Sequence, residues 1–162
     1  MKIITRTPVL WALFGLSVLC VVGFQAFNPA VGGQYLDTLD DPAVLRETLA
    51  GMSEAQKTAH FRVTVLIDTV FPLSFGLLFA GLGWRFFGKW GPLAAVPGFA
   101  VLVVDLTENM IQALALSGAA DVLDAKAWVT PLKMGLFYLA ALIALVAVGV
   151  AVWRMVLKPK GG

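Results

Sequence analysis

The sequence predicts an all-α integral membrane protein in which four transmembrane helices form a bundle. The first observation is composition: 59% of the 162 residues are hydrophobic, 14% are charged, and the mean hydropathy is +0.86. A soluble domain of this length could not bury so much apolar surface. The second observation is four apolar stretches, each long enough to supply the roughly 20 residues that a spanning helix needs.

The four predicted helices follow one another closely along the chain. They cover residues 8–27, 54–83, 92–117 and 131–157. The second helix begins outside the membrane and enters it near residue 62, and residues 28–53 form one long loop before it. These elements use most of the chain, so we expect residues 1–162 to form a single membrane domain.

The first apolar stretch follows Lys2 and Arg6, as the core of a signal peptide would. It is longer than the ~7–15 residues usual for that core and no A-x-A cleavage motif follows, so a retained helix is favoured. One cysteine, Cys20, lies inside this helix, which gives no disulfide framework. One histidine, His60, cannot build a zinc or haem site alone. We therefore expect no cofactor and no metal.

The long loop contains signals for local helix formation. In "DDPAVLRETLAG", Asp41 is a suitable N-cap, Pro42 suits the first helical position and Gly51 suits the end, so a short surface helix is expected. Ser53 and Gln56 then have the spacing of a capping box. This second signal places the start of the next helix in water, before its membrane-spanning part.

Basic residues predict the orientation of the chain. They flank the termini and the connection between the second and third helices: Lys2, Arg6, Arg85, Lys89, Arg154, Lys158 and Lys160. By the positive-inside rule this side is cytoplasmic, so the long loop lies on the non-cytoplasmic side of a cell membrane, plasma or inner. The partner is then the lipid bilayer. A net charge of +2 without a single basic patch argues against nucleic acid.

The third apolar stretch carries four polar residues on one helical face. Asp105, Glu108, Asn109 and Gln112 are spaced i, i+3, i+4 and i+7. A charge at the centre of a spanning helix costs about 2.5–3.5 kcal/mol on insertion scales, so function is the default interpretation for the two acids. The two amides could instead serve as hydrogen bonds between helices.

The second helix has a matching stripe. His60, Thr64 and Asp68 follow one another at intervals of four residues, with Asp68 at the depth of Asn109. Pro72 comes four residues after Asp68 and cannot donate to its carbonyl. The pattern predicts a kink that frees this carbonyl, which must then find another partner inside the membrane.

The fourth helix is predicted to begin with Thr130 as N-cap and Pro131 at the first helical position. Lys133 in the first turn opposes the helix dipole, and extension of its side chain to the lipid headgroups is the favoured interpretation. Stacked by depth, the polar residues describe a funnel. Its mouth is His60, Arg62 and Lys133, with His60 on a water-exposed rim; its waist is Asp68, Asn109 and Gln112; its floor is Glu108 and Asp105.

The leading hypothesis is a site for a lipid-like or hydrophobic small molecule. The catalytic candidates are Asp68, Asp105 and Glu108, and the ligand-binding candidates are His60, Thr64, Asn109, Gln112 and Lys133. A protonated and an ionised carboxyl in an apolar cavity can add and remove protons, which would allow isomerisation. The long loop after the first helix and the acid–proline stretch "IDTVFPL" together resemble EXPERA-type four-helix proteins. These include sterol isomerase-like enzymes and ligand-binding receptors, so the resemblance implies the same kind of site.

Two alternatives use the same residues. Intramembrane acids also mark proton- or cation-coupled transport, which four helices could support only as a homo-oligomer. The pairs Gly76/Ala80 and Ala94/Gly98 are small-residue faces that suit such association or ordinary helix packing. In the other alternative the acids and Lys133 hold helices together in a structural subunit without catalysis.

Overall fold

The computed structural model of the protein describes residues 2–157, which are helical throughout their regular structure and contain no strand. The elements, with η for 3-10 helices, are α1 (Thr7–Phe27), η1 (Asn28–Val31), η2 (Leu36–Thr38), α2 (Pro42–Gly51), α3 (Glu54–Phe86), η3 (Gly88–Trp90), α4 (Gly91–Leu116), η4 (Leu123–Ala125) and α5 (Lys126–Leu157). The long helices α1, α3, α4 and α5 are each long and apolar enough to cross a membrane. The predicted all-α class is confirmed, as is the presence of four helices long and apolar enough to span a membrane.

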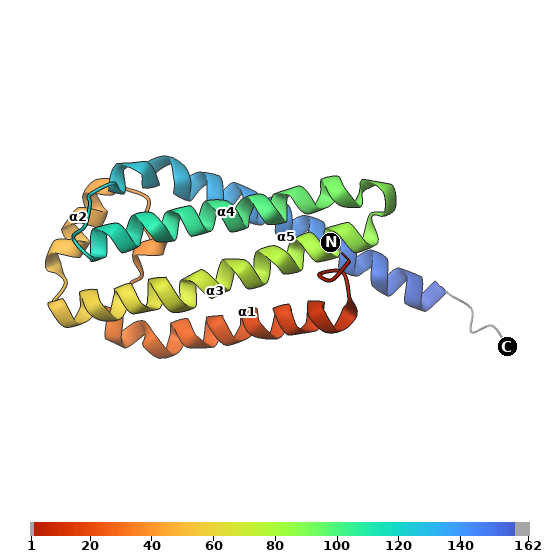
Figure 1. Ribbon diagram of the computed structural model, residues 1–162, viewed down its shortest axis with the longest axis horizontal. Coiled ribbons are helices and arrows are strands. Elements are labelled where there is room, and N and C mark those ends of the chain that lie inside the picture. The colour runs from red at the N-terminus through yellow and green to blue at the C-terminus, as the bar shows by residue number, and fades with distance from the viewer. Residues whose placement is uncertain (1, 158–162) are drawn as a thin grey trace.

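Helix α3 is the central packing element. It packs against each of α1, α4 and α5, and α4 also packs against α5. Figure 1 shows the long helices side by side along the long axis, with α2 beside the start of α3. We call the end that carries α2 the loop end, and the end where α3 passes into α4 the turn end.

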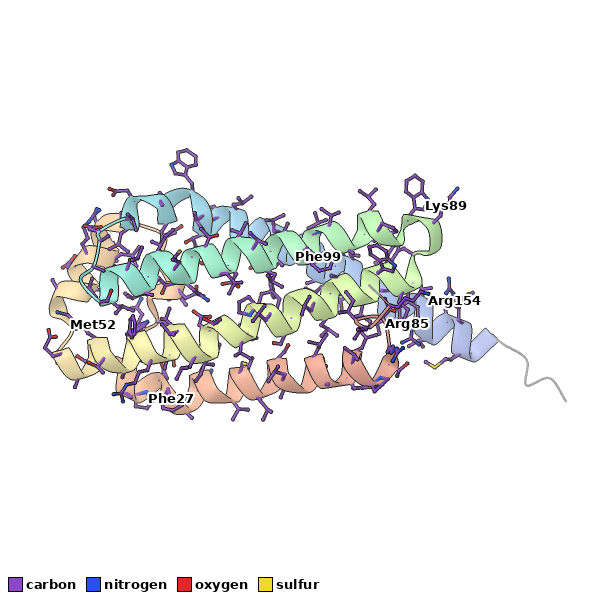
Figure 2. All side chains as sticks on the ribbon, viewed as in Figure 1. Phe27, Met52, Arg85, Lys89, Phe99 and Arg154 are labelled. Carbon is purple, nitrogen blue, oxygen red and sulfur yellow. The ribbon has the colours of Figure 1, made fainter. Side chains whose placement is uncertain are left out.

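Basic residues gather at the turn end. Arg85, Lys89 and Arg154 lie there, at the opposite end from Met52 (Figure 2). The start of the chain lies there too, since Arg85 donates a hydrogen bond to the carbonyl of Thr5 at 3.1 Å. Lys158 and Lys160 lie outside the described residues. The cytoplasmic placement of this end stays a prediction.

The predicted caps of α2 and α3 are confirmed. The Asp41 carboxylate accepts a hydrogen bond from the backbone N–H of Ala43 at 2.8 Å, which caps α2. Ser53 and Gln56 form a reciprocal capping box at the start of α3. These short-range signals succeed because each involves residues within one helical turn.

The predicted start of the last helix is wrong. Helix α5 begins at Lys126, directly after η4, so Thr130 is not an N-cap and Pro131 lies inside the helix. Because Pro131 has no backbone N–H, one carbonyl in the preceding turn lacks its intrahelical donor, at a local cost in stability. What the longer helix gains is a further turn whose polar side chains point into the structure, as described below.

Helices α3 and α4 approach closely in the half nearer the turn end. A Cβ atom added to Gly98 would lie 2.6 Å from the backbone nitrogen of Ala80, and one added to Gly76 would lie 3.0 Å from the carbonyl of Gly98. A Cβ on Gly83 would lie 2.7 Å from the carbonyl of Ala94. The small-residue faces predicted from the sequence are therefore used for packing within this chain, between α3 and α4.

Candidate functional site

The polar residues of the spanning helices face inward, in the half nearer the loop end. All eight candidate side chains are buried, each less than a tenth exposed: His60, Thr64, Asp68, Asp105, Glu108, Asn109, Gln112 and Lys133. The stripes predicted on α3 and α4 therefore point into the structure. This placement is an arrangement of side chains; their predicted roles stay predictions.

Glu108 is the centre of a buried ion-pair cluster. Its Oε1 lies 2.8 Å from the ammonium of Lys126 and accepts a hydrogen bond from the hydroxyl of Thr130, while its Oε2 contacts the ammonium of Lys133. Glu108 and Lys126 are both fully buried. Each partner neutralises the other, which makes ionised groups tolerable away from water. Glu108 thereby joins α4 to the beginning of α5.

The placement of Lys133 differs from the expectation that it extends to the headgroups. It is 5% exposed, and its ammonium lies 2.6 Å from Asp37 in addition to its contact with Glu108. The prediction fails because the helix begins earlier than expected, which moves Lys133 from the first turn to the third. The buried carboxylate of Glu108 and the partly exposed carboxylate of Asp37 then compensate the charge of Lys133.

A short segment of the long loop, residues 35–38, folds over the polar side chains; we call it the strap. The backbone N–H of Leu36 donates to Nε2 of His60 at 3.2 Å, and the carbonyl of Leu36 accepts from Lys126 at 2.9 Å. Asp37 accepts from Lys133 at 2.6 Å and from Gln112 at 3.3 Å. The strap is thus fastened to α3, α4 and α5.

The strap explains why the prediction of a water-exposed funnel mouth is wrong. His60 is 1% exposed instead of lying on a water-exposed rim, because Leu36 covers it. Arg62 is exposed and takes no part in the polar cluster. Since Nε2 of His60 accepts a hydrogen bond, it carries no proton there and the imidazole is neutral.

Asp37 and Lys126 are functional candidates that the sequence reasoning missed. Asp37 lies in η2, a 3-10 helix of three residues, which is too short for a periodic pattern to indicate which way a side chain points. Lys126 did carry a signal, because Lys126, Thr130 and Lys133 are spaced i, i+4 and i+7. Placing the helix start at Pro131 separated Lys126 from that stripe.

The carbonyl that Pro72 leaves free has a partner, as predicted. Pro72 lies inside α3 and cannot donate to the carbonyl of Asp68, and the side-chain amide of Asn109 donates to this oxygen instead. Asn109 is 4% exposed and crosses from α4 to α3. The amide thus replaces a backbone hydrogen bond in a place where water is scarce.

A cavity of about 310 Å³ lies beneath the strap. One part of its wall is polar and is formed by Asp37, Thr38, His60, Thr64, Asp68, Asp105, Gln112 and Lys133. The other part is apolar or aromatic and is formed by Phe24, Tyr35, Phe71, Phe75, Met134 and Phe137. Six of the eight candidate residues therefore line one cavity, while Glu108 and Asn109 lie behind its wall.

Two carboxyl groups on this wall stand apart from the close ion pairs. Asp68 and Asp105 are 6% and 5% exposed. Within residues 2–157, no donor reaches the Asp68 carboxyl, and Asp105 Oδ1 has no hydrogen-bond partner. The ammonium of Lys133 lies 3.8 Å from Asp105, beyond hydrogen-bonding distance. These groups are free to interact with whatever occupies the cavity.

The cluster already contains its own cation. One oxygen each from Asp37, Asp105 and Glu108 lie within 4.8 Å of one another, a spacing that could hold a metal ion. The ammonium of Lys133 contacts the carboxylates of Asp37 and Glu108 and is the positive charge at this point. Burial disfavours the ionised form of Asp37, but the charge of Lys133 outweighs it and lowers the pKa of Asp37 below 3.8.

Comparison of the chain with protein-family models, curated proteins and solved structures gave no match, for the EXPERA-type proteins or any other family. The class that fold and site define is therefore a membrane-like, all-helical protein with a buried carboxylate cluster.

Proposed function

We propose that this protein binds a small amphipathic molecule between its membrane-spanning helices, in the cavity beneath the strap. The observation that carries the proposal is a wall divided into an aromatic part and a polar part with two uncommitted carboxyl groups, Asp68 and Asp105. A cavity of 310 Å³ lies at the lower end of the roughly 300–1,000 Å³ typical of small-molecule sites.

The aromatic wall supports an apolar body for the ligand. Phe71 and Phe75 pack with ring centroids 4.9 Å apart, and Phe137 packs against Phe75 at 5.3 Å. Such interlocked rings have few ways to rearrange and hold a preformed surface. A rigid apolar surface beside buried polar groups favours a molecule with one apolar and one polar end over an ion or a sugar.

The ion-pair cluster supports the binding interpretation in another way. Glu108, Lys126 and Lys133 satisfy one another, so their contacts account for the clasp that the structural hypothesis requires. Asp68 and Asp105 take no part in these contacts. A purely structural role gives no reason to bury two further acids on a cavity wall, because each burial is costly without a partner.

Proton transfer is the second candidate function. Asp68 on α3 and Asp105 on α4 line the same cavity, so one ligand can be reached by two carboxyl groups on different helices. If one is protonated and the other ionised, they could add and remove a proton at different atoms of that ligand, the chemistry of an isomerisation. Binding is common to both functions and is tested first.

The test is photolabelling of the full-length protein in lipid nanodiscs with a neutral aryl-diazirine benzyl alcohol. We expect saturable labelling of peptides that contain Phe71, Phe75 or Met134, with protection by excess 4-phenylbutanol. Thr64→Phe fills the cavity from its polar side and should abolish the saturable component. Saturation separates the cavity from lipid-facing surfaces, which label in proportion to probe concentration.

Val65→Phe is the matched control, because Val65 neighbours Thr64 but is 42% exposed on the outer face of α3. It adds a similar ring without filling the cavity and should leave the saturable component unchanged. The proposal is wrong if wild-type labelling rises linearly with probe concentration at all these peptides, or if both phenylalanine variants label like the wild type.

A further inference from the structure

The acidic groups around the cavity outnumber the basic ones. Four carboxyl groups meet there, those of Asp37, Asp68, Asp105 and Glu108, against the two ammonium groups of Lys126 and Lys133. His60 adds no charge, because its Nε2 accepts a hydrogen bond from Leu36. The acidic groups therefore exceed the ammonium groups by two. The Lys133 ammonium contacts Asp37 and Glu108 closely and lies farther from Asp105, at 3.8 Å, and among the described residues no ion pair involves Asp68.

Hydrogen-bond acceptors are also in excess. Among the described residues, Asp105 Oδ1 and Gln112 Oε1 are buried without a donor, and both residues line the cavity. The Nδ1 of His60 is the one unpaired donor-type atom in the same set. Buried acceptors without donors are costly, so an occupant that brings donors is favoured.

Aromatic rings that line the same cavity attract the same kind of occupant. Phe24, Phe71 and Phe75 form a continuous series of edge-to-face contacts, with neighbouring centroids 5.5 and 4.9 Å apart. Aromatic faces carry partial negative charge and stabilise a cation, most strongly where water is excluded. They also offer an apolar surface to the remainder of the molecule.

We propose that the ligand of this cavity is a monocationic amphiphile, an amine on an apolar or aromatic body, whose ammonium group lies between Asp68 and Asp105. The inference rests on the proposed function and names its ligand class. An ammonium group supplies both the missing charge and the missing donors, and hydrogen bonds from a charged donor to a carboxylate are stronger than neutral ones.

Other ligand classes fit less well. A carboxylate or phosphate would meet the carboxyl groups of Asp68 and Asp105, and the lysines that could attract it are already paired. A bare metal ion uses several oxygen ligands but makes no use of the aromatic wall. A neutral alcohol supplies a donor without the charge, so it is the sharpest competitor for the test.

The test measures protection from the same photolabel by three compounds that share one body: 4-phenylbutylamine, 4-phenylbutanol and 4-phenylbutanoate. At neutral pH these are a cation, a neutral donor and an anion. We expect the amine to protect at concentrations about tenfold lower than the alcohol, and the acid not to protect. Labelling that remains in Thr64→Phe measures partition into lipid and is subtracted for each compound.

Asp68→Asn and Asp105→Asn remove one negative charge each with little change in shape. In each variant the amine should protect only at concentrations close to those of the alcohol, while protection by the alcohol persists. Glu54→Gln is the matched control, because this substitution also removes one negative charge from α3. Glu54 pairs with Lys57 at an exposed site, away from the cavity. It should preserve the preference for the amine.

The outcomes separate the two proposals. Equal protection by amine and alcohol in the wild type would overturn the cationic ligand class and leave the proposed function standing, with protonated carboxyls as the explanation. Absence of a saturable component would overturn both. The wild-type comparison of the three compounds stands even if an asparagine variant fails to fold.

Discussion

Helices α3 and α4 are in contact along two halves that are held together by different means. Nearer the turn end, Gly76 and Gly98 bring the two backbones together, with no room for even a Cβ atom at Gly98. Nearer the loop end, Asp68 and Asp105 line a cavity, and the side-chain amide of Asn109 on α4 donates to the carbonyl of Asp68 on α3. The half nearer the turn end is held by close backbone packing, and the half nearer the loop end contains a cavity crossed by a side-chain hydrogen bond.

The difference shows how a small protein could keep an internal cavity. Close backbone packing in one half fixes the position of both helices. In the other half, beside the cavity, the contacts of Glu108 with Lys126 and Lys133 join α4 to α5. Variants that affect one half or the other test this division.

The largest effect is expected for Lys126→Met, which removes a fully buried charge from the polar half. It leaves Glu108 short of one partner and the carbonyl of Leu36 without its donor. Breaking a buried ion pair on one side costs about 3–5 kcal/mol of folding stability. Thermal unfolding in detergent, followed by circular dichroism, measures the change.

Lys57→Met is the control for Lys126→Met, because Lys57 pairs with Glu54 at the surface and such pairs contribute about 0–1 kcal/mol. The double variant Lys126→Met/Glu108→Gln should recover part of the lost stability. If Lys126→Met unfolds with the same midpoint as Lys57→Met, the polar half is not held together by this cluster.

A smaller effect is expected for Gly98→Val in the close-packed half. The added atoms meet the backbone of Ala80, which cannot move aside as a flexible side chain could. Overpacking of this kind costs about 1–3 kcal/mol of stability. Gly15→Val on α1 is the control, since nothing lies within 4 Å of its added Cβ. A midpoint of unfolding for Gly98→Val equal to that of Gly15→Val would disprove the close contact.

The smallest effect concerns the pH dependence of the strap. Burial opposes ionisation of Asp37 but Lys133 lowers its pKa below 3.8, so the native state binds this proton less readily than the unfolded chain. The contribution of Asp37 is therefore present above about pH 3.8 and is lost as the pH falls through the lower native pKa.

Asp37→Asn should accordingly unfold at a lower temperature than the wild type near neutral pH, with a difference that shrinks below about pH 3.8. Asp40→Asn, at an exposed position of the same loop, controls for the change in net charge. A difference between Asp37→Asn and wild type that is constant with pH would show that the Asp37–Lys133 pair does not fasten the strap.

The parts of the structure that the sequence predicted are those encoded within a few turns of one helix. Apolar length predicts the four long helices, and spacing predicts the inward stripes of Asp68 and Asp105. The caps at Asp41 and Ser53 follow from single turns. The sequence also predicted that the Asp68 carbonyl would have a hydrogen-bond donor, because a freed carbonyl inside a membrane needs one.

What escaped prediction depends on contacts between distant segments. Asp37 reaches Lys133 from a loop 96 positions earlier, and no local pattern reports that contact. His60 becomes buried only because the strap covers it. The start of α5 was misplaced at Pro131, since the preference of proline for the first helical position was outweighed by the buried contacts of Lys126.

The strap also bears on kinetics. Its residues Tyr35, Leu36 and Asp37 are fastened to α1, α3, α4 and α5 by hydrogen bonds with Phe24, His60, Gln112, Lys126 and Lys133. A molecule leaving the cavity on this side needs all of them to open together. Its residence time would then be set by the frequency of that opening, so two ligands of unequal affinity could dissociate at the same rate.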